Sequence, residues 1–113
     1  MEWIDFISNN DNVINSIYFE DSYLFVHIKL WNDEIRRLKF INYHGLKEKN
    51  SIGEEIGDIE VKTESEMIDE LRKDVLEGDG TIDEVADVKS IIFLSVWNEK
   101  VLLEILAENV EME

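Results

Sequence analysis

The sequence predicts a single α+β domain: an antiparallel β-sheet, built from a β-meander and a C-terminal β-hairpin, with one main helix packed on the sheet. Three successive apolar segments are joined by connectors too short for a parallel return, which needs about a dozen residues, so they form a meander. A helical stripe and two further strand-like segments follow, and this order is typical of α+β domains. At 113 residues the chain is expected to be one domain, residues 1–113.

The N-terminal residues predict a short helical element and a first strand. Ile4, Phe6 and Ile7 indicate a helix or turn, which ends at the polar run 8–12. Residues 13–20 are rich in β-branched and aromatic side chains, a composition that favours a strand.

Residues 23–31 and 35–43 predict the second and third strands, joined by the polar connector 32–34. One face of the second strand is apolar: Leu24, Val26, Ile28 and Leu30. The opposite face of the two strands gathers aromatic and basic residues: Tyr23, Phe25, His27, Lys29, Trp31, Arg37, Lys39, Ile41 and Tyr43. We expect the helix to cover part of this face and a protein partner to reach its edge.

The histidines are the candidate metal ligands. With Trp31 paired to Ile35, His27 lies opposite Lys39, whereas His44 lies near the other end of the hairpin. This separation disfavours a shared metal ion. Both histidines are therefore interpreted as hydrogen-bonded structural residues, and no metal or cofactor is expected.

The middle of the chain contains an irregular segment and then the main helix. Residues 51–62 fit either a helical turn or a strand, and both remain open. Thr63 and Glu66 have the spacing of a capping box. Four apolar residues form one helical stripe after them: Met67, Ile68, Leu71 and Val75. The helix is expected to end at residues 78–80, where glycine can take the left-handed conformation.

The C-terminal part predicts a hairpin, with strands at 89–97 and 101–107 and a connector at 98–100. The expected apolar faces are Ile92, Leu94 and Val96 on the first strand and Leu103, Ile105 and Ala107 on the second.

The charge is strongly negative and unevenly distributed along the chain. The formal net charge is -16, and residues 48–87 alone hold fifteen acids and four bases. Six of the eleven bases fall within residues 29–49, before and at the start of this acidic segment: Lys29, Arg36, Arg37, Lys39, Lys47 and Lys49. The sequence therefore predicts a molecule with a modest basic patch and a large acidic one.

The acidic segment is the candidate binding surface, because a concentrated negative field steers and captures basic partners. The residues expected to contact a partner are Glu54, Glu55, Asp58, Glu60, Glu64, Glu66, Asp69 and Glu70. A solvated face that only keeps the protein soluble is the alternative, and it does not require such a concentration.

Several function classes are disfavoured. The negative charge repels nucleic acid and anionic lipid, and no apolar run approaches the roughly 20 residues that span a bilayer. With no cysteine and no basic leader, a cytoplasmic protein is expected. Glu104 is the nearest candidate for a general acid, but strand alternation directs it to solvent together with Glu108. We expect no catalytic residues and no enzyme activity.

A calcium loop is a weaker alternative. Aligning Gly80 with the invariant glycine of an EF-hand makes Glu77, Asp79 and Asp83 ligands, but the positions of two further ligands are Val75 and Ala86. A glycine turn that stops the helix is the simpler interpretation of loop 77–83.

In size, charge and layout the chain resembles the small acidic immunity proteins of bacterial toxin–immunity pairs. Residues 90–107 (SIIFLSVWNEKVLLEILA) look like the terminal hairpin of several such families. The resemblance implies a cytoplasmic, non-enzymatic inhibitor that covers a cognate toxin, frequently a basic nuclease. The second hypothesis is a homo-oligomeric protein, such as a homodimer, in which the 29–49 patch meets a neighbour's acidic face.

Overall fold

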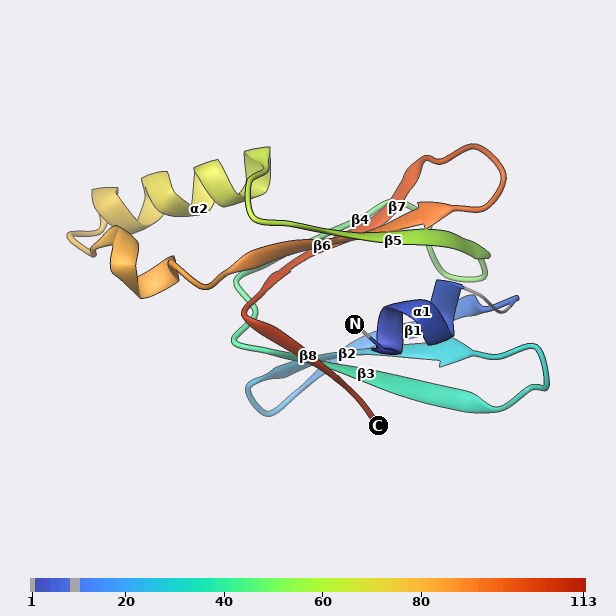
Figure 1. Cartoon of the computed structure of the whole chain (residues 1–113). Coiled ribbons are helices and arrows are strands. Elements are labelled where there is room, and N and C mark those ends of the chain that lie inside the picture. The colour runs from blue at the N-terminus through green and yellow to red at the C-terminus, as the bar shows by residue number, and fades with distance from the viewer. Residues whose placement is uncertain (1, 9–10) are drawn as a thin grey trace.

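A computed structural model describes residues 2–8 and 11–113, and it has the α+β fold that the sequence predicts. The described residues form eight strands, two α-helices and one short 3-10 helix. All strand pairs are antiparallel. The strands are divided between two four-stranded sheets that lie face to face (Figure 1). The sequence pattern did not predict this division.

Sheet A contains the predicted meander. Its order is β1 (Val13–Glu20), β2 (Tyr23–Lys29), β3 (Ile35–Ile41) and β8 (Asn109–Met112). The expected register was wrong by two residues, because Lys29 rather than Trp31 pairs with Ile35. A turn over residues 30–34, with Asp33 at φ 69°, replaces the strand ends that alternation alone predicted.

The two histidines have different neighbours from those that the expected register gave them. His27 pairs with Arg37 and not with Lys39. His44 lies beyond the end of β3, where its amide N–H donates to the Leu106 carbonyl oxygen at 2.7 Å. The chain crosses at this point from sheet A to sheet B.

Sheet B has the order β4 (Gly45–Glu48), β7 (Val101–Ala107), β6 (Lys89–Ser95) and β5 (Ile56–Lys62). In the open segment 51–62, residues 56–62 form the strand β5, and a turn precedes it. The predicted C-terminal hairpin is confirmed as β6 and β7. β4 and β8 were not predicted, because four residues are too few to show a strand period.

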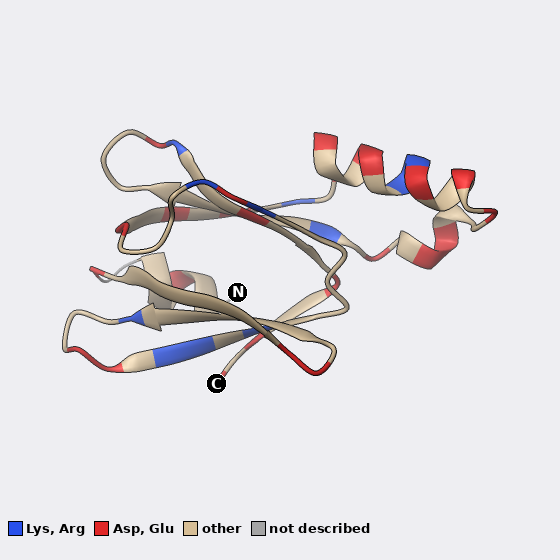
Figure 2. Cartoon of the chain, turned by 180° about the vertical axis from the view of Figure 1, so that it is seen from behind, with Lys and Arg blue, Asp and Glu red and all other residues tan. Residues whose placement is uncertain are grey.

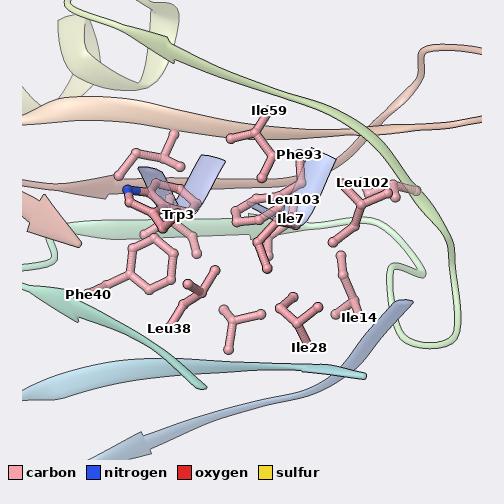
Figure 3. Close-up of a cluster of buried hydrophobic side chains, with 14 of the residues drawn as sticks. Trp3, Ile7, Ile14, Ile28, Leu38, Phe40, Ile59, Phe93, Leu102 and Leu103 are labelled. Atoms are coloured by element: carbon pink, nitrogen blue, oxygen red, sulfur yellow. The ribbon is translucent and has the colours of Figure 1, made fainter. Parts of the chain in front are cut away.

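The main core lies between the two sheets (Figure 3). Helix α1 (Glu2–Ser8) inserts Trp3 and Ile7 into it, where Trp3 contacts Phe93. From β7 the expected Leu103, Ile105 and Ala107 are buried there. From β6 the core takes Ile91 and Phe93, so the expected face with Ile92, Leu94 and Val96 is the outer one. Both faces of β6 carry apolar residues, which made its inner face ambiguous in the sequence.

Helix α2 (Glu66–Glu77) packs on the outer side of sheet B through a second, smaller core. That core consists of Ile68, Val85, Val88 and Leu106, with Met67, Leu71 and Val75 against it. The predicted stripe is thus confirmed. After the helix, Asp79 rather than a glycine takes the left-handed conformation, at φ 63°. Within the described residues, neither helix has the length and apolarity required to cross a membrane.

The capping box predicted from Thr63 and Glu66 was wrong. The N-cap is Ser65, whose Oγ accepts a hydrogen bond from the Ile68 N–H at 3.2 Å. Both spacings place a hydroxyl three residues before an amide, so only the backbone path distinguishes them.

Replacing Ser65 with alanine is expected to lower the free energy of unfolding by about 1 kcal/mol, because an amide at the start of α2 loses its acceptor. Urea denaturation followed by circular dichroism measures this change. Thr63→Ala is the matched control and should be nearly neutral, because Thr63 is exposed outside the helix. Equal losses in the two variants would contradict the cap assignment.

Candidate protein-binding surfaces

The eight acids expected to contact a partner do not form one patch. Glu54 and Glu55 precede β5, Asp58 and Glu60 lie on it, and the others lie at or near α2: Glu64, Glu66, Asp69 and Glu70. They therefore follow the length of sheet B from one end to the other (Figures 1 and 2).

Glu54 and Glu55 directly precede β5, whose first residues lie at the end of the sandwich opposite α2 (Figure 1). The Glu54 carbonyl oxygen accepts from the Ile14 N–H at 3.1 Å, and the Glu55 carbonyl oxygen accepts from the Val96 N–H at 3.2 Å. Their main chains thus help to close the corner between the two sheets. We separate this pair from the acids around α2.

The strongest concentration of acids is a projecting segment that we call the acidic arm, residues 66–87. It comprises α2, the following turn and the 3-10 helix η1 (Ile82–Val85), and it extends past the end of the sheets (Figures 1 and 2). The arm contains nine acids and two bases. Six of these acids were outside the predicted set: Asp74, Glu77, Asp79, Asp83, Glu84 and Asp87. All six lie within residues 48–87, so the charge count over that segment could have identified them.

The small core holds the arm against sheet B, while its far end remains open. Ile68, Val85 and Val88 are buried at the base of the arm. Toward the tip, Leu76 and Ile82 are about half exposed, at 53% and 46%. The tip thus combines carboxylates with two apolar side chains in contact with water.

Both bases of the arm lie close to acids of the same region. The Arg72 guanidinium donates two hydrogen bonds to the Glu64 carboxylate, at 2.8 and 3.1 Å. Lys73 Nζ lies 3.9 Å from Glu77 Oε1. Each of the two cations is thus already close to a carboxylate, so the remaining carboxylates of the arm have little local compensation.

The Arg72 contact makes the stability of the protein depend on pH. Its hydrogen bonds lower the pKa of Glu64, so the folded state favours the ionised carboxylate. This contribution is fully present above the unfolded pKa and is lost as pH falls through the lower folded pKa. In urea denaturation, Glu64→Gln should therefore be less stable than wild type at pH 7, and the difference should shrink toward pH 3. Glu70→Gln is the control, and an equal pH-dependent difference there would contradict this assignment.

The calcium alternative receives no geometric support from loop 77–83. Within residues 2–8 and 11–113, no three acidic or histidine side chains converge closely enough to hold a metal ion. The Gly80 N–H donates to the Val75 carbonyl oxygen at 2.8 Å, so the backbone of the loop turns back on the helix. The loop acts as the stop of α2.

The outer face of sheet A is not covered by α2, which contradicts the expected helix cover. This face carries a network in which Arg37 Nη1 donates to Tyr18 Oη at 3.3 Å and Tyr18 Oη lies 3.0 Å from His27 Nε2. The Arg37 guanidinium also lies 4.3 Å from the Phe25 ring centroid. The hydrogen bond with Tyr18, followed by the charge of Glu113, raises the pKa of Arg37. These contacts give the face a fixed aromatic–cationic surface.

The six bases of residues 29–49 do not form the single patch that the sequence predicted. Lys29, Arg36, Arg37 and Lys39 lie on sheet A, whereas Lys47 and Lys49 lie on and just after β4 in sheet B. Two of the four on sheet A are in ion pairs, Lys29 with Asp33 at 3.3 Å and Arg37 with Glu113 at 2.9 Å. The acidic field therefore has no comparably concentrated basic counterpart.

Glu104 lies on the outer face of sheet B, as alternation predicted. It is half-buried and accepts a hydrogen bond from the hydroxyl of buried Ser90. The pairing partners of Glu104 across the sheet are Lys47 and Ile92. Glu104 does not line the small pocket of about 30 Å³ between Trp3, Val61 and Ile91, which has room for only about one or two water molecules.

The chain matches no protein-family model, no curated protein and no solved structure.

Proposed function

We propose that this protein is a non-enzymatic protein-binding module, an immunity-type inhibitor that neutralises a basic bacterial toxin in the cytoplasm. The acidic arm is the element that contacts the toxin. The observation that carries this proposal is the concentration of nine acids on a projecting segment whose two bases both lie close to acids, Arg72 to Glu64 and Asp69, and Lys73 to Glu77.

The charge of the arm speeds the capture of the basic partner. A dense negative surface speeds the approach of a basic partner, in favourable cases by tenfold or more at low salt. Because the arm projects from the sheets, it can enter a concave surface such as an active-site cleft (Figure 2). Occupation of that cleft would inhibit the toxin without any chemistry by this chain.

The exposed apolar side chains of the arm keep the partner bound. Charged groups at the rim of an interface mainly set the association rate, whereas buried apolar anchors slow dissociation. Leu76 and Ile82 lie among the acids near the tip of the arm. We expect truncation of these two residues to raise the dissociation rate more than it lowers the association rate.

We expect the reading frame upstream of this gene to encode a long protein with a basic C-terminal domain, and co-expression with that domain tests the proposal. That domain should arrest growth when expressed alone, and wild-type chain should restore growth. A variant with Glu70→Gln, Asp74→Asn, Glu77→Gln and Glu84→Gln should lose most of the rescue. The association rate of the purified pair should fall by about tenfold in this variant at low salt.

The matched control removes four exposed acids outside the arm: Glu2→Gln, Glu20→Gln, Glu34→Gln and Glu111→Gln. Both variants have the same net charge, so only the position of the lost charges differs. The control should rescue growth as wild type does. Equal rescue by both variants, or binding that does not weaken with salt, would overturn the role of the arm.

A further inference from the structure

Four strands lie at the edges of the two sheets: β1 and β8 in sheet A, and β4 and β5 in sheet B. An exposed edge strand presents unpaired N–H and C=O groups that invite pairing with another chain, and proteins normally protect such edges. The four edges of this protein differ sharply in that protection.

Three edges carry recognised protection. β4 and β8 are only four residues long, and each contains charged side chains, Lys47 and Glu48 in the first and Glu111 in the second. β5 contains three charged residues, and helix α1 packs against it. Short length, charge and a covering helix all hinder the addition of a further strand.

β1 lacks these devices over most of its length. It has eight residues, and its first seven, 13–19, are uncharged in a chain of which 34% is charged. It contains no lysine, and its bulge lies near its start, between Ile14 and Ser16. Phe19 is 56% exposed at this edge. We propose that β1 is a homodimerisation strand, which pairs antiparallel with β1 of a second copy of this chain.

The backbone of β1 is free where this pairing requires it. Near its start, Ile14 already bonds to Glu54 and Gly53. From Ser16 to Glu20, β2 is the only strand that pairs with β1 among the described residues. A two-residue turn joins Glu20 to Tyr23, and such turns close on a hydrogen-bonded pair. Since the direction alternates, Ile17 and Phe19 direct their N–H and C=O groups away from β2.

A two-fold axis at Tyr18 uses both of these residues. It pairs Ile17 of each copy with Phe19 of the other and aligns the two Tyr18 residues, so four main-chain hydrogen bonds form. Ile17 opposite Phe19 is a β-branched–aromatic pair, a favourable cross-strand combination. Glu20 then lies opposite Ser16, so the paired segments bring no like charges together.

Self-complementarity favours a second copy as the occupant, because the two-fold pairing sets Ile17 opposite Phe19 and Glu20 opposite Ser16. Two chains of -16 repel each other wherever their acidic surfaces meet, but screening at physiological salt limits that repulsion to about 8 Å. The uncharged edge of β1 offers self-complementary contact without acids between the strands. The proposed dimer leaves the acidic arm unused, so it can fail while the proposed inhibitor function stands, and the reverse also holds.

Analytical ultracentrifugation over a concentration series tests the dimer. The average mass of the wild-type chain should rise from 13.3 kDa toward twice that value. Phe19→Lys introduces a charge at the paired edge and should keep the protein monomeric. Thr63→Lys makes the same change in net charge at an exposed position outside sheet A and should dimerise as wild type does.

Hydrogen exchange tests the same proposal without a substitution. The amides of Ile17 and Phe19 should exchange at least about tenfold more slowly in concentrated than in dilute solution. A wild-type mass of 13.3 kDa at every concentration would overturn the proposal, as would a dimer that leaves these amides unprotected. Protection that appears only when a different protein is added would assign β1 to that protein's strand and refute the homodimer.

Discussion

Replacing Phe93 with alanine is expected to lower the free energy of unfolding by about 3–5 kcal/mol, the range for removing a fully buried phenylalanine. Phe93 on β6 is 0% exposed. Its ring centroid lies 6.4 Å from that of Trp3 on α1 and 6.4 Å from that of Phe40 on β3. One side chain thus joins both sheets and the N-terminal helix (Figure 3). Its loss leaves a cavity that three separate elements border.

Urea denaturation monitored by tryptophan fluorescence measures this loss, and Trp3 reports it directly. Trp97→Ala is the matched control, since it also removes a large aromatic ring but from a side chain that is 80% exposed. That variant should change the free energy of unfolding by less than about 0.5 kcal/mol. Comparable losses in the two variants would contradict the placement of Phe93 at the centre of the core.

Long periodic segments were predictable because their pattern depends on local burial alone. The alternation around Leu24 and Val26 identified β2, and the stripe at Ile68 and Leu71 identified α2. Strand ends were less predictable. The turn at 30–34 depends on Asp33 in the left-handed conformation, and a polar tripeptide is compatible with several turn lengths.

The division into two sheets depends on contacts that are distant in the sequence. β8 pairs with β3, and β4 pairs with β7, although each is four residues long. Neither strand has enough residues to show alternation. The sequence therefore indicated the fold class and the main hairpins, while the pairing of the short strands required the three-dimensional arrangement.

The candidate site shows a similar limit. The charge count over 48–87 marked where the acids concentrate along the chain. It did not show that Glu54 and Glu55 belong to a corner of the sandwich whereas Asp74 and Glu84 belong to a projecting arm. Residues that are close in the sequence are certain to be close in space only within one helix or strand. Here β5 separates the two groups of acids by its full length.

Replacing Gly57 with alanine is expected to lower the free energy of unfolding by about 1–3 kcal/mol, the usual cost of overpacking. Gly57 lies at the bulge where β5 meets the end of β6. A Cβ atom there would lie 2.5 Å from Val96 Cα and 2.8 Å from Val96 N. Both neighbours are backbone atoms, so relief requires the β6–β7 hairpin to move away from β5. That movement would also stretch the hydrogen bond of 3.2 Å from the Val96 N–H to the Glu55 carbonyl oxygen.

Gly78→Ala separates this steric effect from the general effect of replacing glycine. Gly78 has a φ of -90°, and its nearest neighbour to an added Cβ is the Asp74 carbonyl oxygen at 3.4 Å. Alanine fits there and restricts the unfolded chain, so the free energy of unfolding should stay unchanged or rise by up to about 1 kcal/mol. Urea denaturation should therefore show a lower free energy of unfolding for Gly57→Ala and no loss for Gly78→Ala. A stabilising Gly57→Ala would mean that β5 and the β6–β7 hairpin do not approach each other at this bulge.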